Sequence, residues 1–239
     1  MVTLLAQLMR DFWLMLVTNW PGSSGHWLRY RYYRTRLARL GAGVTIDPGV
    51  HISNPRYVSI DDNAWIDRGV TILAGPYGGR EREIILQKNP DFRLQEGTVS
   101  IGKNCHVGIR CILSGLAGIQ LEDDVNLGPE TKVYSFTHHY RSRRHPNRPV
   151  VCGSRAAPDK QCLFAGPVVL KARVMIASNG VIMPAVTIGT NSAVLIGGVV
   201  LRSVPDNVVI AGNPSKVVSV RFPNLAESQS PPVVGAHTA

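Results

Sequence analysis

The chain of 239 residues has no long hydrophobic run and only four cysteines. Residues 4–17 are largely apolar, but Arg10 and Asp11 interrupt them, and a membrane span needs about 20 apolar residues. Because Arg10 lies inside this stretch and no clear small-residue cleavage site follows it, we expect no signal peptide. The cysteines show no Cys-x-x-Cys spacing. The six-residue interval between Cys105 and Cys111 favours stacked positions in a repeat over a disulfide, which indicates a reducing compartment.

Acidic side chains are also scarce, since 16 Asp and Glu stand against 26 Lys and Arg, for a formal net charge of +10. Such a balance suits anionic partners, which include cofactor phosphates, anionic lipid and nucleic acid. We expect no nucleic-acid partner, because the sequence contains no recognised nucleic-acid-binding module. A sugar nucleotidyltransferase is disfavoured, because no nucleotide-binding domain precedes the repeat in this chain.

Aliphatic residues recur every six positions in three stretches of the chain. A helix repeats near 3.6 residues and a strand at 2, so neither alone produces this period. The period is typical of a parallel β-helix, in which each short straight segment adds one aliphatic side chain to a shared core. The positions are Ile46, Ile52, Ile60, Ile66 and Ile72; Ile101, Val107, Leu113, Leu121, Leu127 and Val133; and Leu170, Ile176, Ile182, Ile188, Val194 and Val200.

Two segments after the repeat, VPDN at 204–207 and AGNPSK at 211–216, complete a family pattern. Together with the repeat they resemble the hexapeptide-repeat acyltransferases, of the sugar or polysaccharide O-acetyltransferase type. The resemblance covers about residues 42–220. It implies an all-β fold, a left-handed parallel β-helix, and an enzyme that uses acetyl-CoA without a metal. It also implies a saccharide acceptor and a homotrimer with active sites in the clefts between neighbouring copies.

Transfer of an acyl group from a thioester to a hydroxyl needs a general base, and histidine is the usual one because its pKa lies near working pH. The segment LEDDVNLGP at 121–129 resembles the coil that precedes the family's catalytic histidine. Counting on without gaps, the resemblance implies His138 as the base, with His139 as the second choice. The sequence does not identify the group that orients the imidazole; a backbone carbonyl or a carboxylate would serve.

The resemblance also implies a cofactor site along the C-terminal coils. Ser178 matches a contact to the pantetheine or thioester, and Ile196 and Gly197 match a place where the backbone meets the pantetheine arm. Arg202 and Lys216 match basic residues near the nucleotide and its phosphates, where cations are physically sensible.

Acceptor binding departs from the family pattern. Gly108 stands where sugar acetyltransferases often have an asparagine that contacts the acceptor. A simple maltose- or galactoside-type acceptor is therefore disfavoured, and we expect Arg110 and Tyr140 to contact the acceptor. His106 and the loop at 74–98 are further candidates for acceptor contacts.

The chain divides into an N-terminal helical segment (1–41), the β-helix (42–220) and a disordered tail (221–239), with loop excursions at about 74–98 and 134–167. After a break at 21–25, residues 26–40 are predicted to form one helix, with five arginines among aromatic side chains. This helix either lies on the membrane surface or caps the column and packs between subunits. We therefore expect a cytoplasmic protein, with or without attachment to the inner face of the membrane.

Three alternative functions stay open. An amino-group acceptor, on an amino sugar or a xenobiotic, would make the protein an N-acetyltransferase. A β-helix can also serve as a non-catalytic scaffold. A zinc carbonic anhydrase would need three histidines, with His106 and a later pair. The five-residue separation typical of that pair is absent among His138, His139 and His145.

Overall fold

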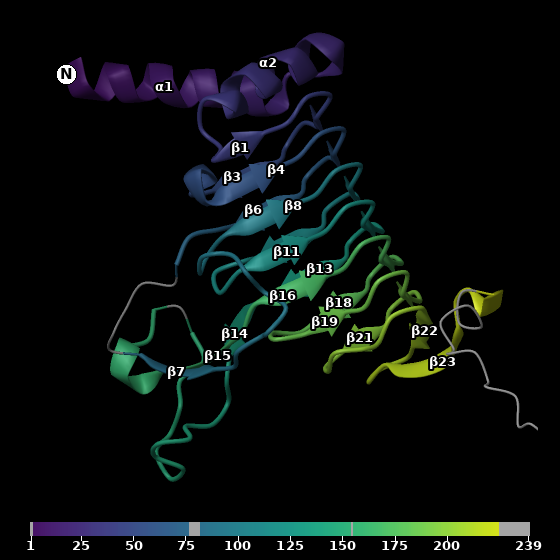
Figure 1. The fold of residues 1–239 in the computed structure, drawn as a ribbon. Coiled ribbons are helices and arrows are strands. Elements are labelled where there is room, and N and C mark those ends of the chain that lie inside the picture. Colours follow the sequence, from purple (N-terminus) through teal and green to yellow (C-terminus); the bar gives the residue numbers. More distant parts are fainter. Residues whose placement is uncertain (1, 77–81, 154, 225–239) are drawn as a thin grey trace, which may run out of the picture.

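The computed structural model describes residues 2–76, 82–153 and 155–224. Two helices, α1 (Val2–Asn19) and α2 (Gly22–Arg34), precede a three-sided column of short parallel strands (Figure 1). Within the described residues no helix is both long and apolar enough to cross a bilayer. Most of the predicted tail, residues 225–239, lies outside the described part of the chain.

Three parallel sheets form the sides of the column, and each coil adds one strand to each of them. The first sheet holds β1 (Arg39–Leu40), β4 (Val58–Ile60), β8 (Val99–Ile101), β11 (Ile119–Leu121), β16 (Val168–Leu170) and β19 (Thr187–Ile188). The second holds β2 (Thr45–Ile46), β5 (Trp65–Ile66), β9 (His106–Val107), β12 (Asn126–Leu127), β17 (Met175–Ile176), β20 (Ala193–Val194), β22 (Val208–Ala211) and the antiparallel β23 (Lys216–Val220). The third holds β3 (His51–Ser53), β6 (Thr71–Leu73), β10 (Ile112–Ser114), β13 (Lys132–Tyr134), β18 (Val181–Ile182) and β21 (Val199–Val200).

The six-residue repeat forms the core of this column, as predicted. All its aliphatic residues are at most 1% exposed, apart from Ile52, which is partly buried. Register explains the burial, because Leu121 lies directly between Ile101 and Leu170 of the neighbouring strands. Each side chain thus loses water to the coils above and below it, and the apolar area removed from water stabilises the stack.

The two predicted excursions do leave the column, but they also pair with each other. We name the resulting sheet of β14 (Phe136–His138), β15 (Cys162–Ala165) and β7 (Glu83–Leu86) the side sheet (Figure 1). Two 3₁₀ turns, at Pro55–Tyr57 and Pro158–Lys160, complete the structure. The repeat could not predict the side sheet, because β7 and β15 are far apart in sequence and follow no common period.

The N-terminal segment differs from the single predicted helix at 26–40. α2 begins at Gly22 and ends at Arg34, and the chain then enters the first coil at β1. Glycines in the expected break serve a close helix contact, since a Cβ on Gly25 would lie 1.9 Å from the carbonyl oxygen of Trp20. One face of α2 caps the column, where buried Arg29 donates to the carbonyl of Ile46 at 2.6 Å.

The cysteines of the described chain are all free, with Cys105, Cys111 and Cys162 buried and Cys152 exposed. Burial raises the pKa of Cys105 to about 12 and that of Cys111 to about 11. Both lie inside the column, as their spacing predicted, and neither is a reactive thiol at neutral pH.

Candidate active site

His138 is held where the chain leaves the column for the side sheet. Ser135 fixes this exit, because its buried hydroxyl donates to the carbonyl of Ser114 at 2.8 Å and accepts the N–H of Ala117 at 3.0 Å. β14 then runs antiparallel to β15, with His138 opposite Leu163. The imidazole is therefore carried on a paired strand rather than on a free loop.

The His138 ring is half-buried, and its Nδ1 atom is buried with no hydrogen-bond partner among the described residues. Buried polar atoms of this kind are rare in folded proteins and usually have a functional reason. A histidine ring can accept a proton on one nitrogen while the other is held by a partner. The ring of His138 thus keeps its capacity for proton exchange.

His139 is engaged in its own turn. Its Nδ1 lies 2.6 Å from the carbonyl oxygen of Arg141, and its ring stacks on Tyr140 with centroids 4.7 Å apart. The short contact assigns the tautomer in which Nδ1–H donates to that carbonyl. Tyr140 itself is 83% exposed. Of the two neighbouring histidines, His138 is the one with an uncommitted buried nitrogen.

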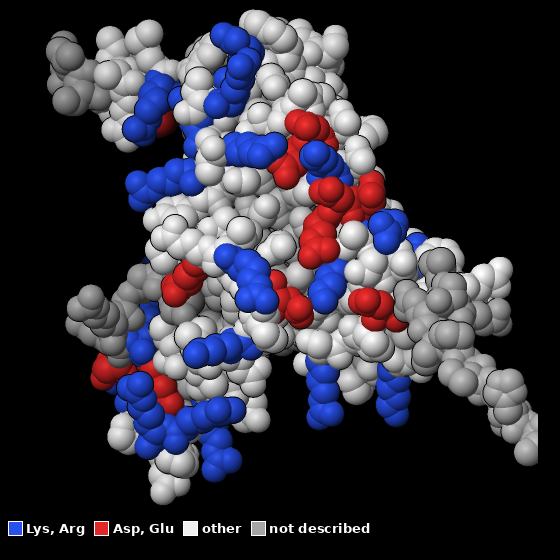
Figure 2. All heavy atoms as spheres, viewed as in Figure 1, with Lys and Arg blue, Asp and Glu red and all other residues white. Residues whose placement is uncertain are grey.

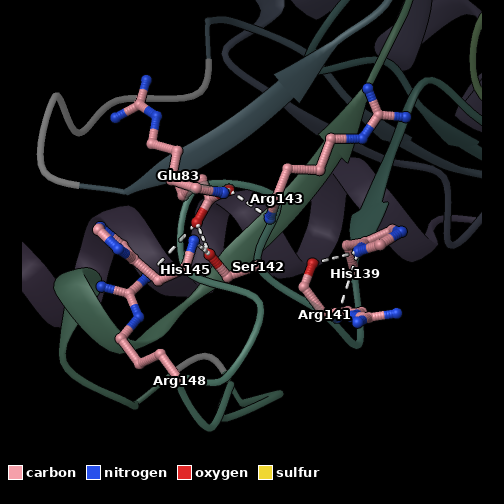
Figure 3. Close-up of polar contacts among 8 residues, drawn as sticks. Glu83, His139, Arg141, Ser142, Arg143, His145 and Arg148 are labelled. Carbon is pink, nitrogen blue, oxygen red and sulfur yellow. Dashed lines mark hydrogen bonds and ion pairs between the residues drawn. The ribbon is translucent and has the colours of Figure 1, made fainter.

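Glu83 ties the two excursions together (Figure 3). Its buried carboxylate accepts the hydroxyl of Ser142 at 2.5 Å and the backbone N–H groups of Arg143 and Arg144 at 2.8 and 3.0 Å. The guanidinium of Arg148 adds an ion pair at 3.4 Å. Burial alone would raise the pKa of Glu83, but these donors outweigh it, and the pKa of Glu83 is lowered.

Sequence reasoning missed Glu83. It stands in a charged run that begins at Arg80, of which the part before Arg82 lies outside the described residues. Its only local signal is its place directly before three aliphatic residues at 84–86. No spacing links it to the basic loop of residues 139–161, so its partners become visible only in three dimensions.

Four of the residues implied by the family resemblance lie at or beside one edge of the column. At this edge, which we call the open corner, the chain turns from the second sheet to the third with a left-handed residue in every coil. The backbone N–H of each coil donates to the coil before it, as Gly197 does to Ser178 at 3.0 Å. The left-handed positions are Gly49, Gly69, Arg110, Glu130, Asn179 and Gly197.

The open corner is accessible to a ligand. Ile196 is 75% exposed, and a Cβ on Gly197 would meet nothing within 4 Å. Arg110 is 75% exposed by its side chain and lies 3.8 Å from Glu130, a weak surface pair. Lys216, exposed at the start of β23, follows Ser215, whose Oγ would lie 3.1 Å from a Cβ on Gly198.

A single copy does not bring all the candidates together. The open corner precedes the strands of the third sheet, whereas His138 follows β13, beyond the opposite edge of that sheet. Arg202 follows β21 and lies at this second edge, away from Ser178. Figure 2 shows further Lys and Arg side chains over the loops of the side sheet. The candidates therefore form two groups separated by the width of one sheet.

Comparison with known proteins adds to this geometry, although no family model matches the chain. A candidate acetyltransferase of Dictyostelium discoideum is 31% identical over 143 residues, which cover 59% of this chain and 67% of that protein. The chain belongs to the hexapeptide-repeat acyltransferase family. Its fold class is therefore the left-handed parallel β-helix.

Two further relatives and one structure place this hexapeptide-repeat acyltransferase more closely. A candidate acetyltransferase of Saccharomyces cerevisiae is 31% identical over 54% of this chain, and the chain spans 60% of that protein's length. WbbJ of Escherichia coli, a candidate O-acetyltransferase of lipopolysaccharide biosynthesis, is 28% identical over 54% of this chain and 75% of that protein. The fold matches AntD, an N-acyltransferase from Bacillus cereus, with a TM-score of 0.66, 23% identity, and coverage of 84% and 92% of the two chains.

The family's missing asparagine has a structural reason in this acyltransferase. A Cβ on Gly108 would lie 2.5 Å from the carbonyl oxygen of Leu127 in the next coil. No side chain fits at this position without moving the backbone. His106, another candidate for acceptor contacts, lies 2.9 Å from Asp67 and 3.2 Å from Asn126. The described residues contain no group of three His, Cys, Asp or Glu that could hold a metal ion.

Proposed function

We propose that this acyltransferase moves an acetyl group from acetyl-CoA to a hydroxyl of a saccharide, with His138 as the general base. The observation that carries the proposal is the half-buried His138 with an uncommitted Nδ1, held on a paired strand beside an acyltransferase column. A ring nitrogen takes the hydroxyl proton as the oxygen bonds to the thioester carbonyl carbon. The carbon–sulfur bond then breaks, and the imidazolium returns the proton to the departing thiolate.

The open corner fits the donor. Ile196 offers an exposed apolar surface to a pantetheine arm, and the bare backbone of Gly197 permits close approach. Ser178 lies one coil away on the same edge. Arg202 and Lys216 are exposed cations on the C-terminal coils, suited to the phosphates of the nucleotide.

A homotrimer would unite the two groups of candidates. In it the side sheet of one copy, with His138, overhangs the open corner of the next copy, because the two lie at opposite edges of the third sheet. Mixing two inactive variants tests this arrangement. His138→Ala loses the base, and Ile196→Glu repels the cofactor from an exposed position. Random mixed trimers recover about a quarter of the activity if the sites are shared, and none if each copy is self-sufficient.

The acceptor we propose is a surface-polysaccharide or lipid-linked glycan precursor at the cytoplasmic face of a membrane. The name of WbbJ supports a polysaccharide hydroxyl, and the basic aromatic N-terminal segment supports a membrane-linked substrate. Arg110 and Tyr140 are exposed enough to contact it. An amino sugar is the second candidate, because AntD was solved with a dTDP-linked 4-amino sugar and coenzyme A.

The deciding experiment is acetyl-CoA turnover, measured as free-thiol release against a panel of saccharides and amino sugars. It should be run in a Cys152→Ser background, since this exposed cysteine would react with thiol reagents itself. Acceptor-dependent release that His138→Ala abolishes supports the proposal, and the better acceptor class separates O- from N-transfer. No release with any acceptor, together with no coenzyme A binding by calorimetry, would favour a non-catalytic scaffold.

A further inference from the structure

The N-terminal helix α1 leaves a large apolar surface uncovered. Figure 1 shows it extending away from the column, while α2 lies across the column's first coil. Its large apolar side chains from Leu4 to Met15 are each between 41% and 66% exposed, and only Val17, near the end of the helix, is fully buried. Burial of such a surface is strongly favourable, and exposed apolar patches of this size mark interaction sites.

The uncovered surface of α1 is one half of the helix. At 100° per residue, Gln7, Arg10 and Asp11 share one side with Leu14, and the other apolar residues lie on the opposite half. A narrow stripe would fit one partner helix, whereas a half-cylinder is typical of a helix that lies in the plane of a membrane interface. The apolar half consists of Leu4, Leu5, Leu8, Met9, Phe12, Trp13, Met15 and Leu16.

This apolar half continues into a groove between the two helices. The groove has a volume of about 280 Å³ and is lined almost entirely by apolar side chains, with three of the chain's four tryptophans. Tryptophan is enriched at membrane interfaces, where its ring lies among the headgroups. The lining residues are Trp13, Leu16, Trp20, Ser24, Trp27 and Leu28.

The charge around the groove selects the partner. Residues 1–40 contain six arginines and one acidic residue, Asp11. On α2, Trp27, Arg31 and Arg34 share the face opposite the one that caps the column, and all three are exposed. Neither of these arginines has an ion-pair partner within the described part of the chain. Figure 2 shows basic side chains over both helices.

We propose that α1, together with the outward face of α2, docks the protein on an anionic bilayer, with the groove taking lipid hydrocarbon. This assignment differs from a surface contact made by α2 alone, because α2 is committed to capping the column and α1 supplies most of the apolar area. The column then points away from the bilayer. The strand before His138, β13, lies three strand spacings from β3, or about 14 Å along the column. A membrane-linked acceptor must therefore present its reacting group well above the headgroups.

Flotation of the full chain with vesicles tests the proposal. We expect binding to phosphatidylcholine vesicles that contain phosphatidylglycerol, and little binding to phosphatidylcholine alone. Leu8→Gln and Leu14→Gln make the same change on opposite halves of α1, and glutamine is compatible with a helix. Leu8→Gln should weaken vesicle partition by about tenfold, whereas Leu14→Gln should have little effect. Arg31→Ala/Arg34→Ala should remove the preference for anionic lipid.

Tryptophan fluorescence gives a second readout that does not depend on activity. In a Trp65→Phe background the remaining tryptophans all line the groove, so brominated lipid should quench them on binding. Absence of flotation and quenching would overturn the proposal. If Leu8→Gln instead lowers the oligomer mass in light scattering without any vesicle binding, α1 packs on a second copy and the bilayer assignment is wrong.

Discussion

The column and the side sheet are both made of short strands, but they depend on different interactions. In the column, each aliphatic side chain is buried by the equivalent side chain of the coils above and below, as Leu121 is between Ile101 and Leu170. In the side sheet, strands from two distant excursions meet, and one buried carboxylate, that of Glu83, collects donors about 60 residues away. The column therefore provides stability by repetition, and the side sheet holds His138 through a few specific contacts.

The largest effect that would break this division concerns catalysis. His138→Ala should lower kcat about 10²- to 10⁴-fold, the usual contribution of a general base, and should leave the thermal midpoint near that of the parent protein. His139→Ala is the matched control, because its ring is engaged with Arg141 and Tyr140. It should cost less than about tenfold. Equal losses in the two variants would contradict the assignment of the base.

The column should show the larger loss of stability. Leu127 is fully buried, and Leu127→Ala should lower the free energy of unfolding by about 2–5 kcal/mol through lost burial and a residual cavity. The same change at Leu195, which is 42% exposed, should cost no more than about 0.5 kcal/mol. Urea denaturation followed by circular dichroism measures both. Similar losses would show that the shared core does not dominate stability.

The same difference explains how much the sequence could predict. The column follows a local rule, one aliphatic side chain every six residues, so its core positions were predictable one by one. The N-terminal helix was misplaced, because Gly22 and Gly25 suggested a break, whereas a tertiary contact, the approach of Gly25 to Trp20, requires a glycine inside the helix. Tertiary contacts of this kind override local propensity.

The candidate site divides in the same way. Ser178, Ile196 and Gly197 could be located because they belong to the repeat, and the structure places them on or beside one open corner. His138 was found by its distance from a repeat coil. Its support by β15 and Glu83 could not be found, because contacts between excursions have no period and depend on how two loops fold back together.

A moderate effect should separate the two regions through Glu83. Glu83→Gln removes a charged acceptor of several hydrogen bonds, which should cost about 1–3 kcal/mol and loosen the basic loop. Trypsin should then cleave faster after Arg141–Arg148, while the column resists. Glu130→Gln makes the same change at a half-exposed position of the open corner and should leave cleavage unchanged. Unchanged cleavage in Glu83→Gln would show that other contacts hold the side sheet.

The smallest effect is a pH dependence confined to the side sheet. The hydrogen bonds from Ser142 and the loop backbone favour the ionised form of Glu83 and lower its pKa in the folded protein. The carboxylate therefore stabilises the fold in full above the unfolded-state pKa of about 4.3, and this contribution is lost as pH falls through the lower folded-state value. Hydrogen exchange should show the amides of Arg143 and Arg144 opening below about pH 4 while those of the column stay protected. In Glu83→Gln these two amides should exchange faster at neutral pH and lose this acid-dependent step, because the glutamine cannot ionise. An acid step that persists in Glu83→Gln would place the titrating group elsewhere, and the side sheet would not depend on this one carboxylate.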